Sequence, residues 1–254
     1  MSIRVAINGF GRIGRLTFRQ MMSDDRMEVV AINDIAPLDN LAYLLKYDSA
    51  LPDPGVEIEA GDGALHYDGE EIPFSQIKTP AELPWGENEV QVAVEATGVL
   101  KDRASCEGHL SAGAERVVIT ANSDDADLTV VMGVNHDWYD PDEHRIISNA
   151  SCTTNCLSPV AKVLDEEFGI ETGFLTTTHG VTSSQAVVDR PIKKRRRGRS
   201  ALTSIIPTTT GAAVATTIVL PQLEGKMDGM AMRVPVISGS VIDFVARLEK
   251  PVSV

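Results

Sequence analysis

Two residues in the second half of the chain have side chains suited to covalent catalysis, Cys152 and His179. Cys152 stands in SNASCTTNC, residues 148–156, where Ser151 is a suitable helix N-cap. The sulfur is therefore expected in the first helical turn, where the macrodipole favours the thiolate. Because its hydroxyl-rich neighbours cannot all be buried without partners, this helix start is predicted to face solvent, another domain or a ligand.

The other cysteines favour different interpretations. A single cysteine is more often a buried small apolar residue than a nucleophile. Cys156 lies one turn further along the same helix and is expected to be packed more deeply, as such an apolar residue. Three cysteines cannot all pair, and the N-terminal segment has no leader pattern, so reduced thiols and a cytoplasmic location are predicted.

A glycine-rich loop near the N-terminus fits the dinucleotide pattern G-x-G-x-x-G. Gly9 permits a tight turn, Gly11 lets the backbone approach a pyrophosphate, and Gly14 allows close packing of helix and strand. Asp34, at the end of the next strand, can accept hydrogen bonds from the adenosine ribose and would repel a 2′-phosphate. The loop alone is weak support, but in this context it predicts NAD binding in preference to NADP.

The elements around this loop predict a doubly wound α/β domain. Residues 3–8, a helix to Met22 and residues 27–33 form a strand–helix–strand unit, and further buried strands are expected at 90–95 and 116–120. Turn residues within 55–75 predict an inserted β meander. We expect a Rossmann NAD-binding domain over residues 1–150.

A second, α+β domain with a mixed or antiparallel sheet is predicted for residues 151–254. It begins with an N-capped helix over 151–168, followed by strands at 173–178, 229–234 and 241–248.

Composition describes an acidic globular protein. Apolar residues make up 43% and charged residues 23%, and no apolar stretch is long enough for a membrane span. A net charge of −13 opposes non-specific binding of nucleic acid. The basic run KKRRRGR at 193–199 is the exception, and such a run is usually a solvated face.

Five motifs together resemble the glyceraldehyde-3-phosphate dehydrogenase family. They are NGFGRIGR at 8–15, LLKYDS at 44–49, SNASCTTNC at 148–156, IIPTTTGAA at 205–213 and GMAMRVP at 229–235. The resemblance extends over essentially the whole chain, in the family's order and spacing.

The resemblance implies a mechanism that these residue types can support. Cys152 thiolate attacks the aldehyde of glyceraldehyde 3-phosphate, and His179 accepts the hydroxyl proton as hydride leaves to NAD. Inorganic phosphate then attacks the thioester and releases 1,3-bisphosphoglycerate. Taken alone, His179 would more often be a structural side chain, and its pairing with Cys152 is inferred from the family.

The resemblance also assigns the groups that bind anions and cofactor. Thr182 and Arg233 are implied to hold one phosphate, and Ser151, Thr153, Thr210 and Gly211 the other, with Arg197 near by. The implied dinucleotide contacts are Asn8, Gly9, Phe10, Gly11, Arg12, Ile13, Gly14, Asp34, Lys78, Thr97, Gly98 and Thr120. No metal is expected. Residues 193–199 fall in the family's S-shaped loop between subunits, which implies a homotetramer and argues against a nucleic-acid role.

Three departures from the family pattern matter. His179 is followed by Gly-Val-Thr where the family has Ala-Tyr-Thr, and residues 236–240, Val-Ile-Ser-Gly-Ser, replace Pro-Asn-Val-Ser. The chain also stops at Val254, short of the family's usual length, so this 254-residue polypeptide alone is expected to have little or no dehydrogenase activity. Measurement of NADH production by the purified chain tests that expectation.

Two other functions stay open from the sequence. Erythrose-4-phosphate dehydrogenase shares the cysteine motif and the dinucleotide loop, and turnover of the two aldehydes would distinguish them. A non-catalytic NAD-binding or assembly protein, with RNA as a ligand of the basic loop, is the alternative from another class. Fast iodoacetate labelling of Cys152 relative to Cys106 would argue against it.

Overall fold

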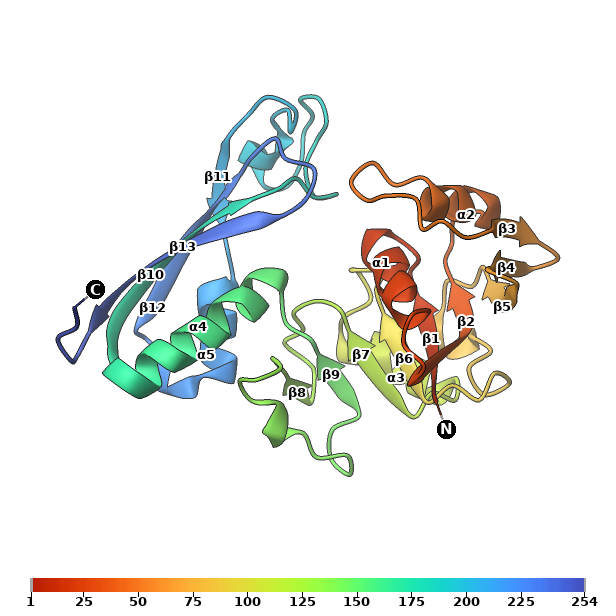
Figure 1. The fold of residues 1–254 in the computed structure, drawn as a ribbon, viewed down its shortest axis with the longest axis horizontal. Coiled ribbons are helices and arrows are strands. Elements are labelled where there is room, and N and C mark those ends of the chain that lie inside the picture. The colour runs from red at the N-terminus through yellow and green to blue at the C-terminus, as the bar shows by residue number, and fades with distance from the viewer. Residues whose placement is uncertain (1, 254) are drawn as a thin grey trace. The chain divides into compact units, whose positions relative to one another are not determined.

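The computed structural model describes residues 2–253, and the chain divides into two compact units (Figure 1). The first contains the residues up to Val130 together with Tyr139–Ala150, and the second contains Val131–Trp138 and the residues from Ser151 onward. The division predicted after residue 150 differs from this in residues 131–138. That segment packs with the second unit because the Lys162 ammonium donates hydrogen bonds to the carbonyls of Gly133 and Val134, at 3.2 and 3.0 Å.

A nine-stranded sheet forms the centre of the first unit, in the order β3-β4-β5-β2-β1-β6-β7-β9-β8 among the described residues. Its parallel strands are β1 (Ile3–Asn8), β2 (Met27–Asn33), β6 (Val92–Glu95), β7 (Arg116–Ile119), β8 (Leu128–Thr129) and β9 (Ile146–Ser148). The meander is β3 (Ile58–Gly61), β4 (Ala64–Tyr67) and β5 (Glu70–Ser75), of which β5 joins β2 in parallel. The predicted doubly wound sheet and inserted meander are both present.

This unit also contains helices α1 (Arg12–Met21), α2 (Leu38–Lys46) and α3 (Arg103–Ser111) and the short 3₁₀ helix η1 (Pro80–Glu82). The short 3₁₀ helices of the second unit are η2 (His136–Trp138), η3 (Arg195–Gly198) and η4 (Pro221–Leu223). The last four residues of β1 and the last five of β2 are buried, as expected for strands covered on both faces. Phe10 packs edge-on against Phe18 in the same core. β1 and β2 are thereby fixed beneath the glycine-rich loop that joins β1 to α1.

The second unit is a four-stranded mixed sheet with helices. It consists of α4 (Cys152–Phe168), β10 (Ile170–His179), β11 (Ile206–Thr209), α5 (Ala212–Val219), β12 (Met227–Arg233) and β13 (Ser240–Leu248). The strand order is β11-β12-β10-β13, with β10 and β12 parallel and the other pairs antiparallel. Leu157 of α4 and Ala212 and Ala213 of α5 pack with Leu175 of β10. The mixed sheet confirms the predicted fold class, although β11 and α5 in this unit, like β8 and β9 in the first, were not predicted.

Register within this sheet brings together two residues that are far apart in sequence. His179, at the end of β10, pairs with Arg233 at the end of β12. Because the strands are parallel, both side chains lie at the same edge of the sheet.

No helix in residues 2–253 is both long and apolar enough to cross a membrane.

Candidate active site

The nucleophile candidate occupies the first position of α4. Ser151 is the N-cap, and its hydroxyl accepts a hydrogen bond from the Thr154 N–H at 3.1 Å, as predicted for this helix start. The Cys152 thiol is exposed, and its Sγ lies 3.5 Å from Nε2 of His179. The structure therefore brings together the two residues that the sequence suggested for covalent chemistry.

The backbone orients the His179 ring. Nδ1 lies 2.7 Å from the Gly180 carbonyl oxygen, and a hydrogen on Nδ1 would donate to it. In that tautomer Nε2 carries a lone pair towards the thiol. The Arg233 guanidinium also donates to the Gly180 carbonyl at 3.0 Å and closely contacts Nδ1. Since a protonated Nδ1 cannot accept from Arg233, we assign the Nδ1 hydrogen to the carbonyl and treat Arg233 as a neighbouring charge.

Electrostatics keep His179 available as a base. Burial is the main cause that lowers its pKa below the ordinary value, and the hydrogen bond with the Gly180 carbonyl acts in the opposite direction. The positive charges of Arg233 and Arg197 lower the pKa further. The imidazole is therefore neutral at pH 7 and can accept a proton.

The Arg233 guanidinium is half-buried beside this pair. Burial is the largest cause that lowers its pKa, and the positive charge of Arg197 lowers the pKa further. The charge of Cys152 raises it. Its Nε–H is buried and has no hydrogen-bond partner among the described residues. A buried guanidinium donor without a partner is suited to an anionic ligand.

Arg197, on the same unit, forms hydrogen bonds with side-chain hydroxyl groups. Its Nε donates to Thr208 Oγ1 at 3.0 Å, and its Nη1 approaches Ser184 Oγ at 3.4 Å. Ser184 Oγ in turn lies 2.8 Å from Thr182 Oγ1. Sequence reasoning missed Ser184 and Thr208, although the hydroxyl-rich runs that contain them could have indicated both.

The remaining predicted anion ligands have local hydrogen bonds. Thr210 Oγ1 accepts from the Ala212 N–H at 3.1 Å, and Gly211 is the N-cap of α5 without a side-chain cap. Ser151 Oγ is engaged in capping α4, and Thr153 is buried. Their roles in phosphate binding stay predictions.

The other two thiols have contrasting surroundings. Cys106 is fully buried, and burial raises its pKa to about 12, with the charge of Glu95 as a further cause. Cys156 is exposed, so the expectation that it is packed was wrong. Thr153 and Thr154 are buried, and so are Leu157 and Ser158 one turn later, which leaves position 156 on the open side of α4.

An Arg197→Met variant should raise the pKa of His179. Because the guanidinium charge disfavours the imidazolium, its removal should move the histidine titration to higher pH. The check is NMR titration of the His179 ring protons in wild type and variant. Arg190→Met is the control, because it removes a positive charge from the same loop that does not act on the pKa of His179. A titration unchanged by Arg197→Met would contradict this electrostatic account.

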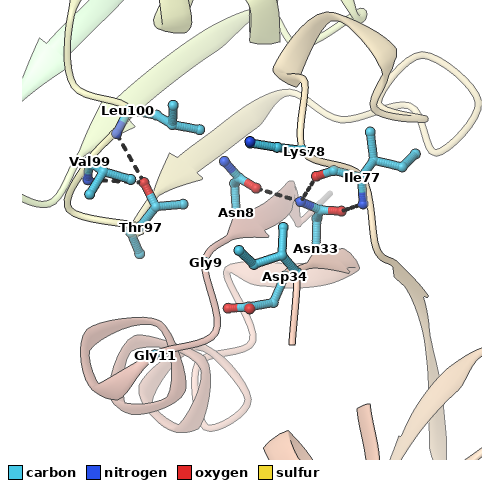
Figure 2. Close-up of a pocket in the computed structure, with 12 residues that line it drawn as sticks. Asn8, Gly9, Gly11, Asn33, Asp34, Ile77, Lys78, Thr97, Val99 and Leu100 are labelled. Atoms are coloured by element: carbon cyan, nitrogen blue, oxygen red, sulfur yellow. Dashed lines mark hydrogen bonds between the residues drawn. The ribbon is translucent and has the colours of Figure 1, made fainter. Parts of the chain in front are cut away.

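A cavity of about 350 Å³ lies at the carboxyl ends of β1, β2 and β6 in the first unit (Figure 2). Its walls are Asn8, Gly9, Gly11, Asn33, Asp34, Ile35, Ile77, Lys78, Ala96, Thr97, Val99 and Leu100. Ligands of open α/β sheets bind at this edge, where neighbouring connections run in opposite directions.

The glycine-rich loop fits a pyrophosphate. Gly9 has a φ of +92°, and a Cβ there would lie 2.5 Å from the Thr97 nitrogen. A Cβ on Gly14 would lie 2.0 Å from the Gly9 carbonyl oxygen, whereas one on Gly11 would meet nothing within 4 Å. No side chain caps α1, whose first turn begins with Arg12 and Ile13. Free N–H groups and the helix dipole there suit phosphate oxygens.

Asp34 is fixed beside this loop. One carboxylate oxygen accepts from the Phe10 N–H at 2.6 Å, and the other accepts from the Ala36 N–H at 2.9 Å. The carboxylate is half-buried and lines the cavity, as needed for a group that binds ribose hydroxyls.

The predicted cofactor residues fall into two groups. Those that line the cavity are Asn8, Gly9, Gly11, Asp34, Lys78 and Thr97. Those that do not are Phe10, Arg12, Ile13, Gly14, Gly98 and Thr120. The Phe10 ring lies in the core, and Arg12 forms an ion pair with Asp48 at 3.4 Å. Asn33 and Ile77 were missed, although Asn33 directly precedes Asp34 at the end of a predicted strand.

A cavity of this kind at the carboxyl ends of a parallel sheet, behind a G-x-G-x-x-G loop, is a feature of NAD-dependent oxidoreductases. Family models agree with this class. Residues 3–103 match the glyceraldehyde 3-phosphate dehydrogenase NAD binding domain, and residues 151–254 match the C-terminal domain of the same enzyme.

Individual relatives agree along the whole chain. It is 50% identical over 254 residues to glyceraldehyde-3-phosphate dehydrogenase of Streptomyces coelicolor and 51% identical to that of Geobacillus stearothermophilus, covering all of this chain and 76% of each relative. Glyceraldehyde-3-phosphate dehydrogenase 2 of Bacillus subtilis is 49% identical over 253 residues, or 74% of its length. The chain belongs to the glyceraldehyde-3-phosphate dehydrogenase family.

Proposed function

We propose that this protein oxidises glyceraldehyde 3-phosphate with NAD and inorganic phosphate to give 1,3-bisphosphoglycerate, with Cys152 as nucleophile and His179 as base. The observation that carries the proposal is the 3.5 Å separation of Cys152 Sγ and His179 Nε2. A thiol at this distance from a neutral imidazole can transfer its proton to the ring, and the sulfur is then free to attack a carbonyl carbon.

The residues supply the acid–base steps. The thiolate adds to the aldehyde carbon, and the resulting alkoxide takes the thiol's former proton back from the His179 imidazolium to give a hemithioacetal. His179 then accepts the hydroxyl proton while the C–H bond breaks, which leaves a thioester on Cys152. NAD supplies the acceptor for the hydride. Phosphate oxygen attacks the thioester carbon, and the C–S bond breaks to regenerate the cysteine sulfur.

Cationic side chains near the pair support binding of two anions. Arg233 and Arg197 act on the pKa of His179, and Arg197 also contacts Ser184 and Thr208. We assign Thr182 and Arg233 to one phosphate and Ser151, Thr153, Thr210 and Gly211 to the other, with Arg197 beside them. Guanidinium groups, hydroxyls and backbone N–H groups are suitable donors to phosphate oxygens.

Cofactor contacts are proposed on the first unit. Asp34 would hold the adenosine ribose and disfavour a 2′-phosphate, and the N–H groups of Arg12 and Ile13 would face the pyrophosphate. Asn8, Gly9, Phe10, Gly11, Gly14, Lys78, Thr97, Gly98 and Thr120 complete the proposed cofactor set. The anchoring of Asp34 by Phe10 N–H supports this assignment.

We extend the proposal to a cytoplasmic homotetramer that works in glycolysis and gluconeogenesis. The support is the family membership and the sequence of the loop at 193–199, which in the family lies between subunits. Sedimentation velocity of the purified chain would measure its assembly state.

Mass spectrometry of the acylated protein tests the proposed chemistry. Incubation with glyceraldehyde 3-phosphate and NAD, without phosphate, should leave a 3-phosphoglyceroyl group on the Cys152 peptide, and added phosphate should remove it. A single turnover is enough for detection, and erythrose 4-phosphate serves as the competing aldehyde. An adduct on Cys156, no adduct, or preferential acylation by erythrose 4-phosphate would contradict the proposal.

A further inference from the structure

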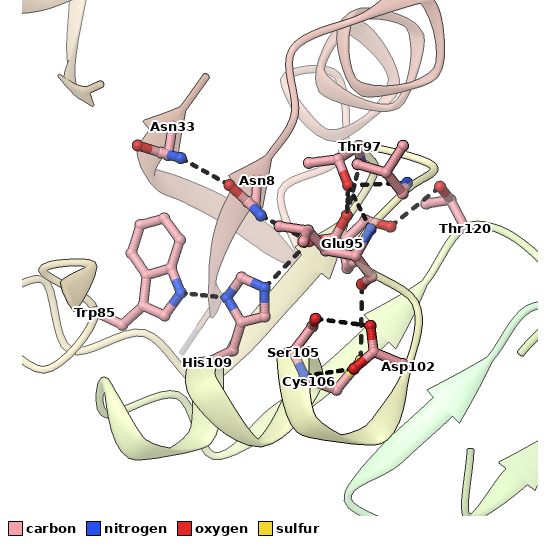
Figure 3. A network of polar contacts seen from close by, with 12 residues as sticks. Asn8, Asn33, Trp85, Glu95, Thr97, Asp102, Ser105, Cys106, His109 and Thr120 are labelled. Carbon is pink, nitrogen blue, oxygen red and sulfur yellow. Dashed lines mark hydrogen bonds and ion pairs between the residues drawn. The ribbon is translucent and has the colours of Figure 1, made fainter. Parts of the chain in front are cut away.

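A buried polar network lies behind the dinucleotide cavity, centred on Glu95 (Figure 3). Glu95, Asn8 and Asn33 are the last residues of β6, β1 and β2, and the strand register places Asn8 opposite both of the others. The three side chains are at most 2% exposed. Glu95 does not line the cavity, yet Asn8 and Asn33 both do.

Both carboxylate oxygens of Glu95 accept hydrogen bonds from residues of the cavity wall. Oε2 accepts from Asn8 Nδ2 at 2.6 Å, and Oε1 accepts from the Thr97 N–H at 2.8 Å and from the Thr97 hydroxyl. Thr97 Oγ1 then accepts from the N–H groups of Val99 and Leu100, at 3.3 and 3.2 Å. Glu95 thereby fixes the end of β1 and the loop after β6 on two sides of the cavity.

The network extends outward from Asn8 as well. Asn8 Oδ1 accepts from Asn33 Nδ2 at 2.7 Å, and Asn33 Oδ1 accepts from the Ile77 N–H at 2.9 Å. Ile77 lines the cavity beside Lys78. One carboxylate is therefore connected to three separate segments of the cavity wall.

The directions of the hydrogen bonds in this network require a group at position 95 that only accepts, which is a carboxylate. Trp85 Nε1–H can only donate, and it lies 2.9 Å from His109 Nδ1, which must accept. The His109 hydrogen is then on Nε2 and donates to Glu95 Oε2, at 3.1 Å. Every group that faces Glu95 is a donor, so an amide in its place would set an NH₂ group against at least one other donor.

We propose that Glu95 is a positioning residue for NAD: through Asn8 and Thr97 its buried carboxylate holds the cavity wall in the shape that binds the dinucleotide. Thr97 is central because its nitrogen is the atom that a Cβ on Gly9 would strike. A displaced Thr97 would therefore change the space around the phosphate turn. The inference rests on NAD as the cofactor and not on the roles of Cys152 and His179.

Glu95→Gln tests the proposal, with Glu59→Gln, an exposed residue of β3, as the control of equal charge. Calorimetric titration with NAD well below the unfolding midpoint should show about a tenfold increase in Kd for Glu95→Gln, because a buried donor loses its acceptor. Glu59→Gln should bind as wild type does. A folded Glu95→Gln protein with wild-type Kd would overturn the proposal, even if its unfolding midpoint is lower.

A pair of His109 variants extends the test to a second position, in case Glu95→Gln does not fold. His109→Gln can accept from Trp85 and donate to Glu95, whereas His109→Leu can do neither. We expect a lower Kd for NAD in His109→Gln than in His109→Leu, and equal values would count against the network. If the control fails to bind NAD, the cofactor assignment itself is wrong. Iodoacetamide labelling of Cys152 should be unchanged in all these variants.

Discussion

Substitution of Gly9 by alanine is expected to weaken NAD binding by about two orders of magnitude or to prevent folding of the first unit. At a φ of +92° a side chain is strained, at a cost of about 1–2 kcal/mol. The new Cβ would also lie 2.5 Å from the Thr97 nitrogen and 2.8 Å from the Ala96 carbonyl carbon, and backbone atoms can only yield by moving. Both residues line the dinucleotide cavity.

Gly55→Ala is the control that separates the effect of backbone strain from the effect of steric overlap. Gly55 has a φ of +77°, but a Cβ there would meet nothing within 4 Å. This control should lose about 1–2 kcal/mol of unfolding free energy through strain alone and keep its affinity for NAD. Thermal unfolding and NAD titration of both variants make the comparison. If Gly9→Ala loses no more stability than Gly55→Ala and also keeps its affinity for NAD, the close contact of a Cβ at position 9 with Thr97 does not matter and the account is wrong.

The three cysteines are expected to differ in alkylation rate at pH 8 by three orders of magnitude or more from fastest to slowest. Cys152 is exposed beside His179 Nε2 and should react fastest. Cys106 should remain unlabelled, because burial and a pKa of about 12 leave on the order of one thiolate in ten thousand at that pH. Cys156 is exposed but, among the described residues, has no neighbouring base like His179, and it should react at an ordinary rate.

Quantitative peptide mapping after timed exposure to iodoacetamide measures all three rates in one sample. Cys152→Ser should lose the fast phase and keep the slower labelling of Cys156. A fast phase that persists in this variant would assign the reactive thiol to another residue.

Local sequence rules were sufficient to predict the structure around the glycine-rich loop. The run from Ile3 to Asn33 specifies a strand, a glycine turn, a helix and a second strand through contacts between near neighbours, and the Ser151 cap specifies the start of α4 in the same way. Strand ends could be predicted to within a few residues because buried strands are compact runs of β-branched residues.

Features set by tertiary pairing were beyond these rules. His179 and Arg233 lie close together because β10 pairs with β12 in parallel. Between these two strands the chain forms the loop that contains residues 193–199, then β11 and α5. The family resemblance, rather than periodicity, brought these residues into the prediction. Likewise, no local pattern shows that Lys162 holds residues 131–138 on the second unit, or that Cys156 faces outward.

The buried polar network centred on Glu95 is another feature that local sequence rules could not predict. A glutamate at the end of an apolar strand is ordinarily expected in solvent. It is buried here because Asn8 and Thr97 supply donors from the neighbouring strand end and the following loop, and His109 supplies one more from α3. Only the strand order shows that these groups converge.

The alkylation rate of Cys152 in a His179→Asn variant at pH 7 tests the central claim most directly. If His179 accepts the thiol proton across the 3.5 Å contact, its loss should slow the reaction about tenfold or more. His136→Asn, which changes an exposed histidine of the same unit, should leave the rate unchanged. Equal rates in wild type and a correctly folded His179→Asn protein would contradict the cysteine–histidine pair on which the proposed mechanism depends.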